Sequence, residues 1–335
     1  DKSLIQKSVQ KSISKNEKLS EFLSNQGFKS ISERLKNNSF INIQSEKKPE
    51  EKKLKKNYLL ISSTEELDKL NIVVKQKGFC AIDTETNSLN IEDAELVGVS
   101  IAISEKSAYY IPINHKDLKD NKKVKDQIKE TTLIKFLKLI CSDKSILKIG
   151  HNIKYDLRIL DKYDVKCNSI ADTMLLSYAI DNGVTKHNMD DLAYLHLNHS
   201  NLKFKELVGS GKKEITFDYV EINKALEYAA EDALITMKLF NFLNERVKTE
   251  KNNFVYNEID LPLVNTLSQI EKNGIKINTN YLNELSKEFE KESLILENKI
   301  FKLAGKDFNI GSPKQLGEIL FIELKIAGGK KTKSG

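Results

Sequence analysis

Residues 79–85 read Phe-Cys-Ala-Ile-Asp-Thr-Glu, an apolar run that ends in two acids. The apolar run predicts a buried strand. Residues two apart in a strand share a face, so the side chains of Asp83 and Glu85 point the same way. Two carboxylates this close raise each other's pKa unless a cation lies between them, and hard divalent cations favour carboxylate oxygens. The same pattern also occurs where an ordinary strand ends and turns into solvent.

A second acid follows another apolar run, in residues 149–156 (Ile-Gly-His-Asn-Ile-Lys-Tyr-Asp). The pattern predicts a strand that ends at Gly150 and a helix that starts near Asn152. Asp156 then lies one turn into this helix, at the positive end of its dipole. An acid in a first turn and an Asn at an N-cap are also common without any functional role.

The third acidic stretch is helical, in residues 228–232 (Tyr-Ala-Ala-Glu-Asp). Tyr228 and Asp232 are four residues apart, so they project from one face, where a phenol and a carboxylate together can orient a water molecule. Glu231 lies about a hundred degrees around the helix and is expected to face elsewhere. The ordinary alternative is a Tyr on a core face with an Asp at its edge.

The patterning around these stretches predicts an α/β layered domain. Residues 62–66 supply a helix N-cap with acids in the first turn, and helices are expected to follow the last strand through to about residue 248. Strands are expected at 58–61, 79–84, 96–103, 108–113 and 145–149, with helices at 64–77 and 133–141. This order describes a mixed sheet flanked by helices. Beyond residue 258, two helical patterns surround the turn at 272–274, and Ser312-Pro313 opens a third helix.

Composition bounds the function more weakly than the motifs do. The 335 residues are 39% hydrophobic and 30% charged, and no apolar run is long enough to span a membrane. The net charge of +6 comes from residues 1–56, which hold 14 basic and 7 acidic residues, so charge alone does not indicate nucleic acid. Three separated cysteines argue against a disulfide framework or a zinc site and favour the cytoplasm. The first residue is not Met, so we expect a fragment of a longer chain.

Taken in order, the strand DxE, the Nx₃D and the Yx₃D stretches resemble the three exonuclease motifs of the DEDD superfamily, in its Tyr-bearing branch. The resemblance is closest to the proofreading domain of the bacterial DNA polymerase I family. The segments that carry it are residues 150–156, 171–175, 187–193 and 228–233. Segments that resemble the opening of that family's polymerase domain, in its thumb, are 261–264, 270–275, 308–316 and 330–335. Residues 19–35 are similar to the end of the upstream 5′-nuclease domain.

The resemblance implies a ribonuclease H-like α/β fold followed by a truncated, all-helical thumb segment. It divides the chain into a linker with a nuclease remnant (1–56), a 3′→5′ exonuclease domain (57–250) and the N-terminal part of a polymerase domain (251–335). The palm and fingers of a polymerase are absent from this sequence, so we expect no polymerisation by this chain.

The resemblance also implies a reaction that depends on two divalent metal ions, with Mg²⁺ expected and Mn²⁺ or Zn²⁺ able to substitute. Asp83 would contact both ions. Glu85 and Asp232 would complete the site of the ion that binds the attacking water, and Asp156 would hold the other ion, partly through water. Tyr228 would orient the nucleophile with help from Glu85.

The implied substrate is a single-stranded or frayed DNA 3′ end, bound by a monomer through stacking and backbone contacts. Leu89 and Phe204 would wedge and stack on the terminal bases, and Thr86, Asn152 and Tyr155 would contact the last nucleotides. Considered without the resemblance, Phe204 is equally a core aromatic and Leu89 an ordinary packing residue.

Two other functions remain open at this point. An exoribonuclease like RNase D shares the same motifs, although the thumb-like tail argues against it. A catalytically silent module that holds DNA or spaces domains is the second alternative, although all four acids are present.

Overall fold

The computed structural model describes residues 57–183, 185–211 and 214–327. The predicted linker and nuclease remnant (1–56) and the tail motif at 330–335 lie outside the described residues. One compact unit ends at Lys272 and a second begins at Asn273. The predicted domain boundary at residue 250 rests on the family resemblance and stays a prediction.

The first unit is built on a six-stranded sheet with the order β1-β4-β3-β2-β5-β6. The strands are β1 (Asn57–Leu60), β2 (Phe79–Thr86), β3 (Leu96–Ser104), β4 (Ser107–Pro112), β5 (Leu147–Gly150) and β6 (Ile170–Asp172). Strand β3 runs antiparallel to both of its neighbours, whereas β1–β4, β2–β5 and β5–β6 pair in parallel. This mixed, ribonuclease H-like sheet confirms the predicted fold class.

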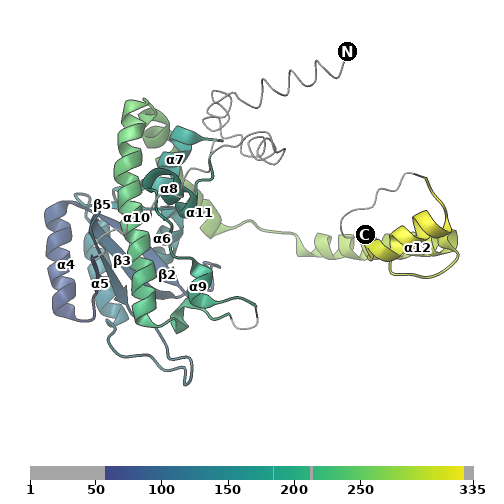
Figure 1. Cartoon of the computed structure of the whole chain (residues 1–335), viewed down its shortest axis with the longest axis horizontal. Helices are drawn as coiled ribbons and strands as arrows, with labels where there is room; N and C mark the ends of the chain where they lie inside the picture. Colours follow the sequence, from purple (N-terminus) through teal and green to yellow (C-terminus); the bar gives the residue numbers. More distant parts are fainter. Residues whose placement is uncertain (1–56, 184, 212–213, 328–335) are drawn as a thin grey trace, which may run out of the picture. The chain divides into compact units, whose positions relative to one another are not determined.

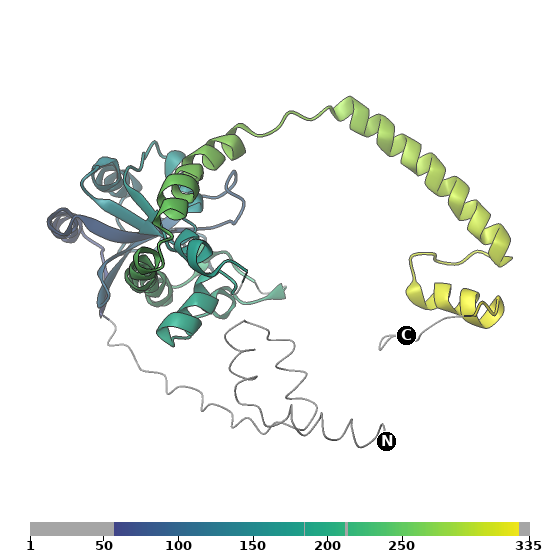
Figure 2. The same ribbon diagram turned by 90° about the horizontal axis from the view of Figure 1, so that it is seen from above.

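Helices cover both faces of the sheet (Figures 1 and 2). The helices of this unit are α4 (Thr64–Lys77), α5 (Glu130–Ser142), α6 (Ile153–Asp161), α7 (Thr173–Asp181), α8 (Met189–Leu197), α9 (Phe204–Val208), η2 (Phe217–Tyr219), α10 (Ile222–Thr249), η3 (Val255–Asp260) and α11 (Leu261–Asn273). The first helix starts as predicted, because the Ser63 side chain and Glu66 form a reciprocal capping box. Strand β6 was missed by the sequence analysis, which expected only helices in that region.

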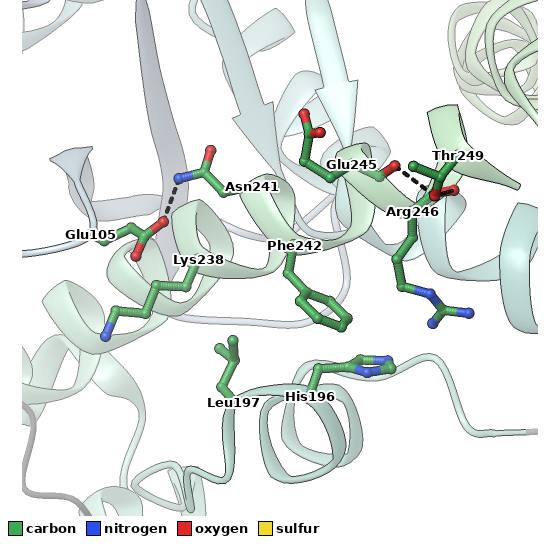
Figure 3. A pocket seen from close by; sticks show the side chains of 9 residues that line it. All are labelled: Glu105, His196, Leu197, Lys238, Asn241, Phe242, Glu245, Arg246 and Thr249. Atoms are coloured by element: carbon green, nitrogen blue, oxygen red, sulfur yellow. Dashed lines mark hydrogen bonds between the residues drawn. The ribbon is translucent and has the colours of Figure 1, made fainter.

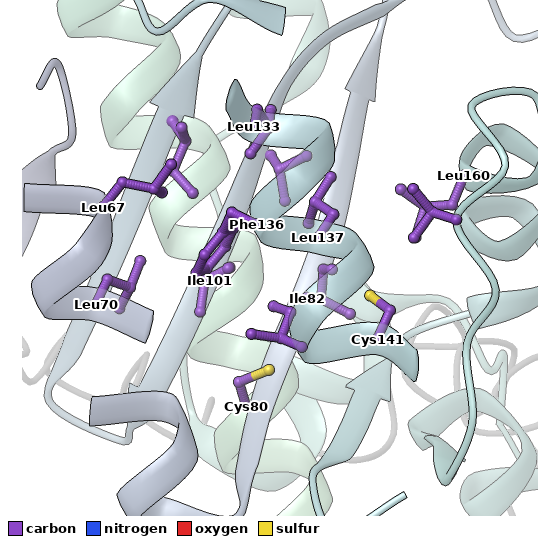
Figure 4. Close-up of a cluster of buried hydrophobic side chains, with 14 of the residues drawn as sticks. Leu67, Leu70, Cys80, Ile82, Ile101, Leu133, Phe136, Leu137, Cys141 and Leu160 are labelled. Carbon is purple, nitrogen blue, oxygen red and sulfur yellow. The ribbon is translucent and has the colours of Figure 1, made fainter. Parts of the chain in front are cut away.

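The residues of β2 alternate between two different cores. Cys80 and Ile82 pack with α4 and α5 in a large hydrophobic cluster (Figure 4). Ala81 faces the other way, into a cluster that contains Ala230 and Ala233 of α10. Small side chains on both partners allow α10 to approach the sheet closely. Because alternation continues along the strand, the next two odd-numbered residues of β2 also face α10.

The segment after α10 belongs to the first unit. The Tyr256 side chain of η3 is buried, and its hydroxyl accepts a hydrogen bond from the Asp172 backbone N–H at 3.0 Å. Helix α11 is joined to α6 by ion pairs between Lys154 and Glu271 and between Lys272 and Asp161. Residues 255–272 therefore contact the edge strand β6 and both ends of α6.

The second unit contains α12 (Thr279–Ala304), α13 (Pro313–Gly317) and η4 (Glu318–Glu323). The predicted helix start at Ser312-Pro313 is confirmed, since the Ser312 side chain accepts from the Gln315 backbone N–H and Pro occupies the first turn. Among the described residues, none in α12 is buried. No described helix is long and apolar enough to cross a membrane.

Candidate metal centre

Three carboxylates from two elements meet where α10 crosses β2. Asp83 and Glu85 of β2 and Asp232 of α10 each offer an oxygen, and these oxygens lie within 4.8 Å of one another. Glu85 is only 6% exposed, and its Oε1 has no hydrogen-bond partner within the described chain. Such a buried acceptor is costly unless something binds it. Three converging carboxylates, one of them with an unpartnered buried oxygen, fit a hard divalent cation.

The acids resist ionisation in the absence of a cation. Burial, followed by the charge of Asp232, raises the pKa of Asp83 to about 8. Burial also raises the pKa of Asp232 to about 7 and that of Glu85 well above its usual range. A bound cation would reverse this preference, because opposite charge favours the carboxylate form.

The fourth predicted acid, Asp156, belongs to α6 and lies beside the other three. It is 2% exposed, and its Oδ1 accepts hydrogen bonds from the Thr84 backbone N–H at 2.8 Å and from Thr84 Oγ1 at 2.6 Å. Burial and then the charge of Asp83 raise the pKa of Asp156, while the two Thr84 bonds oppose this. The sequence analysis missed the role of Thr84, whose only signal was its place between two acids of the DxE pattern.

Tyr228 and Asp232 share one face of α10, as their spacing predicted. The Tyr228 hydroxyl hydrogen-bonds to Asp232 and lowers the pKa of that acid, and burial raises the pKa of Tyr228. The ring of Phe204 lies 5.9 Å from that of Tyr228 and is 40% exposed, so one side of Phe204 packs and the other faces solvent. The aromatic group therefore lies beside the acids with a face open to a ligand.

Glu231 faces away from the three-acid cluster, as predicted. Its buried carboxylate accepts from His199 Nε2 at 3.1 Å and from the Leu202 backbone N–H at 2.7 Å. These two bonds fasten residues 199–202 to α10, next to Asp232. The segment that leads into Phe204 is thus held against the helix that carries the third acid.

Of the remaining predicted contact residues, Thr86 and Tyr155 are bonded to each other, whereas Leu89 and Asn152 are exposed. Thr86 Oγ1 and the Tyr155 hydroxyl are 2.6 Å apart, and both hydrogen-bond to the Ser88 carbonyl. Leu89 follows and is 87% exposed, which is not the environment of an ordinary packing residue. Asn152 is exposed at the N-cap of α6, with φ of 60° and no side-chain capping bond.

The capping function expected of Asn152 is supplied instead by Asp172, at the end of the missed strand β6. Its buried carboxylate accepts from four backbone N–H groups. They belong to Asn152, Ile153, Met174 and Leu175, at 3.2, 2.8, 2.8 and 3.3 Å. One side chain therefore caps both α6 and α7, and it sets the start of the helix that carries Asp156.

We expect Asp172→Ala to lower the free energy of unfolding by about 3 kcal/mol or more, since each buried donor left without an acceptor costs about 1–3 kcal/mol. Urea denaturation monitored by circular dichroism measures this loss. Asp172→Asn keeps one acceptor oxygen and should lose less. A loss below about 1 kcal/mol for Asp172→Ala would show that solvent replaces the carboxylate at these donors.

A large pocket lies away from the acids (Figure 3). Its volume is about 620 Å³, and it is bounded by the end of α8 and the second half of α10. Phe242 lies over His196 there, with ring centroids 4.9 Å apart. None of the predicted site residues lines this pocket.

The fold is that of a ribonuclease H-like domain, with an acidic cluster at its sheet that could hold a metal ion. A family model described as 3′-5′ exonuclease matches residues 58–248, and the chain belongs to this family. A second model, described as DNA polymerase family A, matches residues 279–335.

Curated relatives extend the comparison over most of the chain. DNA polymerase I of Rhizobium leguminosarum is 39% identical over 291 residues, which are 83% of this chain and 29% of the relative. DNA polymerase I of Pseudomonas aeruginosa is 38% identical over 259 residues, 76% of this chain and 28% of the relative. The chain thus spans less than a third of these relatives. The solved POL domain of Pol1 from M. smegmatis, in complex with DNA primer-template and dNTP, shares the fold, with a TM-score of 0.57 and 21% identity over 80% of this chain and 42% of that chain.

Proposed function

We propose that this chain hydrolyses the terminal phosphodiester bond at the 3′ end of single-stranded or frayed DNA and releases nucleoside 5′-monophosphates. The observation that carries the proposal is the convergence of Asp83, Glu85 and Asp232 within 4.8 Å, with Asp156 beside them. Membership of the 3′-5′ exonuclease family supports the same reaction.

The four acids are proposed to hold two divalent ions, with Mg²⁺ expected and Mn²⁺ or Zn²⁺ as substitutes. Asp83 would serve both ions, Glu85 and Asp232 one of them, and Asp156 the other. When bound, such ions activate a water molecule, shield the phosphate and stabilise the leaving 3′-oxygen. The positive charge of the ions would also lower the raised pKa values of these buried acids and keep them ionised.

The side chains around the acids are proposed to orient the reactants. The Tyr228 hydroxyl would position the attacking water together with Glu85. The exposed face of Phe204 and the exposed Leu89 would hold the terminal bases by stacking, which suits a substrate of any sequence. Thr86, Tyr155 and Asn152 would contact the last nucleotides.

The whole protein is proposed to be a DNA polymerase I that acts in DNA replication and repair in the cytoplasm, and this chain a monomeric part of it. In this proposal residues 57–250 form the exonuclease domain and residues 251–335 begin the polymerase domain. Residues 1–56 would link it to an upstream nuclease.

The test is digestion of a 5′-labelled single-stranded DNA oligonucleotide by the wild-type chain, with Mg²⁺ and with EDTA. We expect a ladder that shortens from the 3′ end with Mg²⁺ and no product with EDTA. A 3′-phosphorothioate terminus and an RNA oligonucleotide of the same sequence serve as controls. Preferential digestion of the RNA would favour the exoribonuclease alternative, and an intact DNA substrate with Mg²⁺ would contradict the proposal.

A further inference from the structure

The loop of residues 87–95, here the Leu89 loop, has a defined internal structure. The backbone N–H of Asn87 donates to the Glu95 carbonyl at 3.2 Å, and the Glu95 N–H donates to Asn87 Oδ1 at 2.8 Å, which closes the base of the loop. Leu89 projects from this closed loop with most of its side chain in solvent. Surface loops are in general more mobile than the elements that they connect, so the place of Leu89 depends on contacts between the loop and the rest of the domain.

Contacts of this kind come from Arg158 on one face of α6 and from Lys162, the C-cap residue of that helix. Arg158 Nη2 donates to Glu92 Oε1 at 2.9 Å. Lys162 Nζ donates to three carbonyls of the loop, those of Ile91, Glu92 and Ala94, at 2.8, 3.0 and 2.6 Å. All three protons of the ammonium group are therefore directed at the loop backbone.

The spacing of these contacts follows from helix geometry. Tyr155, which bonds the Ser88 carbonyl, precedes Arg158 by three residues, and Lys162 follows Arg158 by four. Residues at this spacing share one face of a helix. Asp156 projects from a different side of α6, toward Thr84. The same short helix thus holds a proposed metal ligand on one side and the Leu89 loop on another.

Arg158 is fixed from a second direction as well. Its Nη1 lies 3.3 Å from Glu271 Oε2 of α11, and Glu271 also pairs with Lys154. The Arg158 side chain is only 12% exposed, so this cation is enclosed between carboxylates of two different segments. An enclosed, doubly paired guanidinium has little freedom to move.

We infer that Arg158 and Lys162 are positioning residues that set Leu89 at a fixed place relative to the four acids. The hydrogen-bond partners of their side chains are Glu271 and residues of the Leu89 loop and include none of the four acids, so the pair would act through the loop. The inference rests on the proposed function, because it gives Leu89 the task of holding terminal bases. It assigns substrate specificity to the pair: the loop is needed for a nucleic acid end and not for a phosphodiester without bases.

The experiment compares two substrates at saturating Mg²⁺, a single-stranded DNA oligonucleotide and methyl 4-nitrophenyl phosphate, which has no base. Lys162→Met keeps the apolar stem and removes the donors. We expect its KM for the oligonucleotide to rise about tenfold, the scale of one lost base-stacking contact, with hydrolysis of the small ester unchanged. Arg158→Met should show the same split, that is, a raised KM for the oligonucleotide with unchanged hydrolysis of the small ester. Lys162→Arg should keep most of the wild-type affinity for the oligonucleotide.

Two controls separate positioning from a general effect. Lys166→Met removes the same charge from the same region, but Lys166 pairs with Asp161 and not with the Leu89 loop, so both substrates should react as in the wild type. Leu89→Ala should reproduce the split. Adding Lys162→Met to Leu89→Ala should raise KM no further, whereas a further tenfold rise would overturn the inference. If Lys162→Met lowered the kcat/KM for the oligonucleotide and for the small ester by the same factor, that result would overturn the inference as well.

Amide hydrogen exchange of the metal-free protein tests whether Lys162 supports the Leu89 loop, and it requires no catalysis. Lys162→Met should speed exchange within residues 87–95 and leave residues 228–232 unchanged, and Lys166→Met should do neither. If the wild type leaves DNA intact, the proposed function fails while exchange still reports on the support of the loop. Unchanged exchange in the Leu89 loop of Lys162→Met would overturn the inference.

Discussion

Asp83→Ala is expected to slow release of 3′ nucleotides by about a thousandfold or more, equivalent to at least ~4 kcal/mol of transition-state stabilisation. The reason is position: Asp83 lies next to Glu85 and Asp232 in the cluster and is coupled to Asp156 as well. A centre that lacks it would lose a ligand proposed to serve both ions. Single-turnover digestion of 5′-labelled DNA measures the rate.

The stability of the same variant separates a chemical effect from a folding defect. In the metal-free wild type, burial and then the charge of Asp232 raise the pKa of Asp83, and burial and then the charge of Asp83 raise the pKa of Glu85. Removing Asp83 therefore relieves both the cost of burying a charge and the repulsion between acids. We therefore expect metal-free Asp83→Ala or Asp83→Asn to be at least as stable as the wild type near pH 8. Asp68→Ala, at an exposed position on α4, is the matched control and should digest DNA normally. Undiminished digestion by Asp83→Ala would sink the assignment of this centre.

The second large effect is on stability as a function of pH and metal. Asp83 and Asp232 have pKa values of about 8 and about 7 in the folded protein, well above the usual 3.8. Between about pH 4 and the pKa of each acid in the folded protein, the folded state therefore keeps a proton that the unfolded chain releases. Metal-free stability is therefore highest at low pH within this window and falls as pH rises from about 4 to about 8, by up to ~1.4 kcal/mol per pH unit for each retained proton.

A divalent cation should cancel this loss, because it binds the ionised carboxylates. We expect saturating Mg²⁺ to raise the melting temperature strongly at pH 8 and only slightly at pH 5. Thermal unfolding at both pH values, with Mg²⁺ and with EDTA, measures the difference. The double variant Asp83→Asn with Asp232→Asn should lose the part of the pH dependence that these two acids contribute, while Glu85 and Asp156, whose pKa values are also raised, keep theirs. It should also lose the response to Mg²⁺. An equal pH dependence in that variant would trace the effect to other groups.

Local patterns were reliable guides wherever neighbouring residues decide the structure. The apolar run before Asp83 forms the predicted strand, and period-two alternation places Asp83 and Glu85 on one face. Tyr228 and Asp232 share a helix face because the spacing of four matches one helical turn. Each of these arrangements needs only backbone geometry over a few residues.

Local patterns failed where a short element or a long-range bond decides. Strand β6 has three residues, too few for a hydrophobic period, and it forms because β5 offers an edge with which to pair. Asn152 does occupy the N-cap of α6, but its side chain makes no capping bond, and Asp172 supplies the acceptor from another strand. Thr84 looked like a spacer between two acids, yet it holds Asp156 across 72 residues of sequence.

The sequence alone determined the class of fold, the kinds of chemical group available and which acids share a strand or a helix face. Only the tertiary structure decided that these acids meet, and it did so because alanines on β2 and α10 bring that helix close to the sheet. The support of the Leu89 loop by Arg158 and Lys162 arises in the same way. Bonds between distant segments depend on how whole elements pack, and that information is spread over the entire core instead of any one stretch of residues.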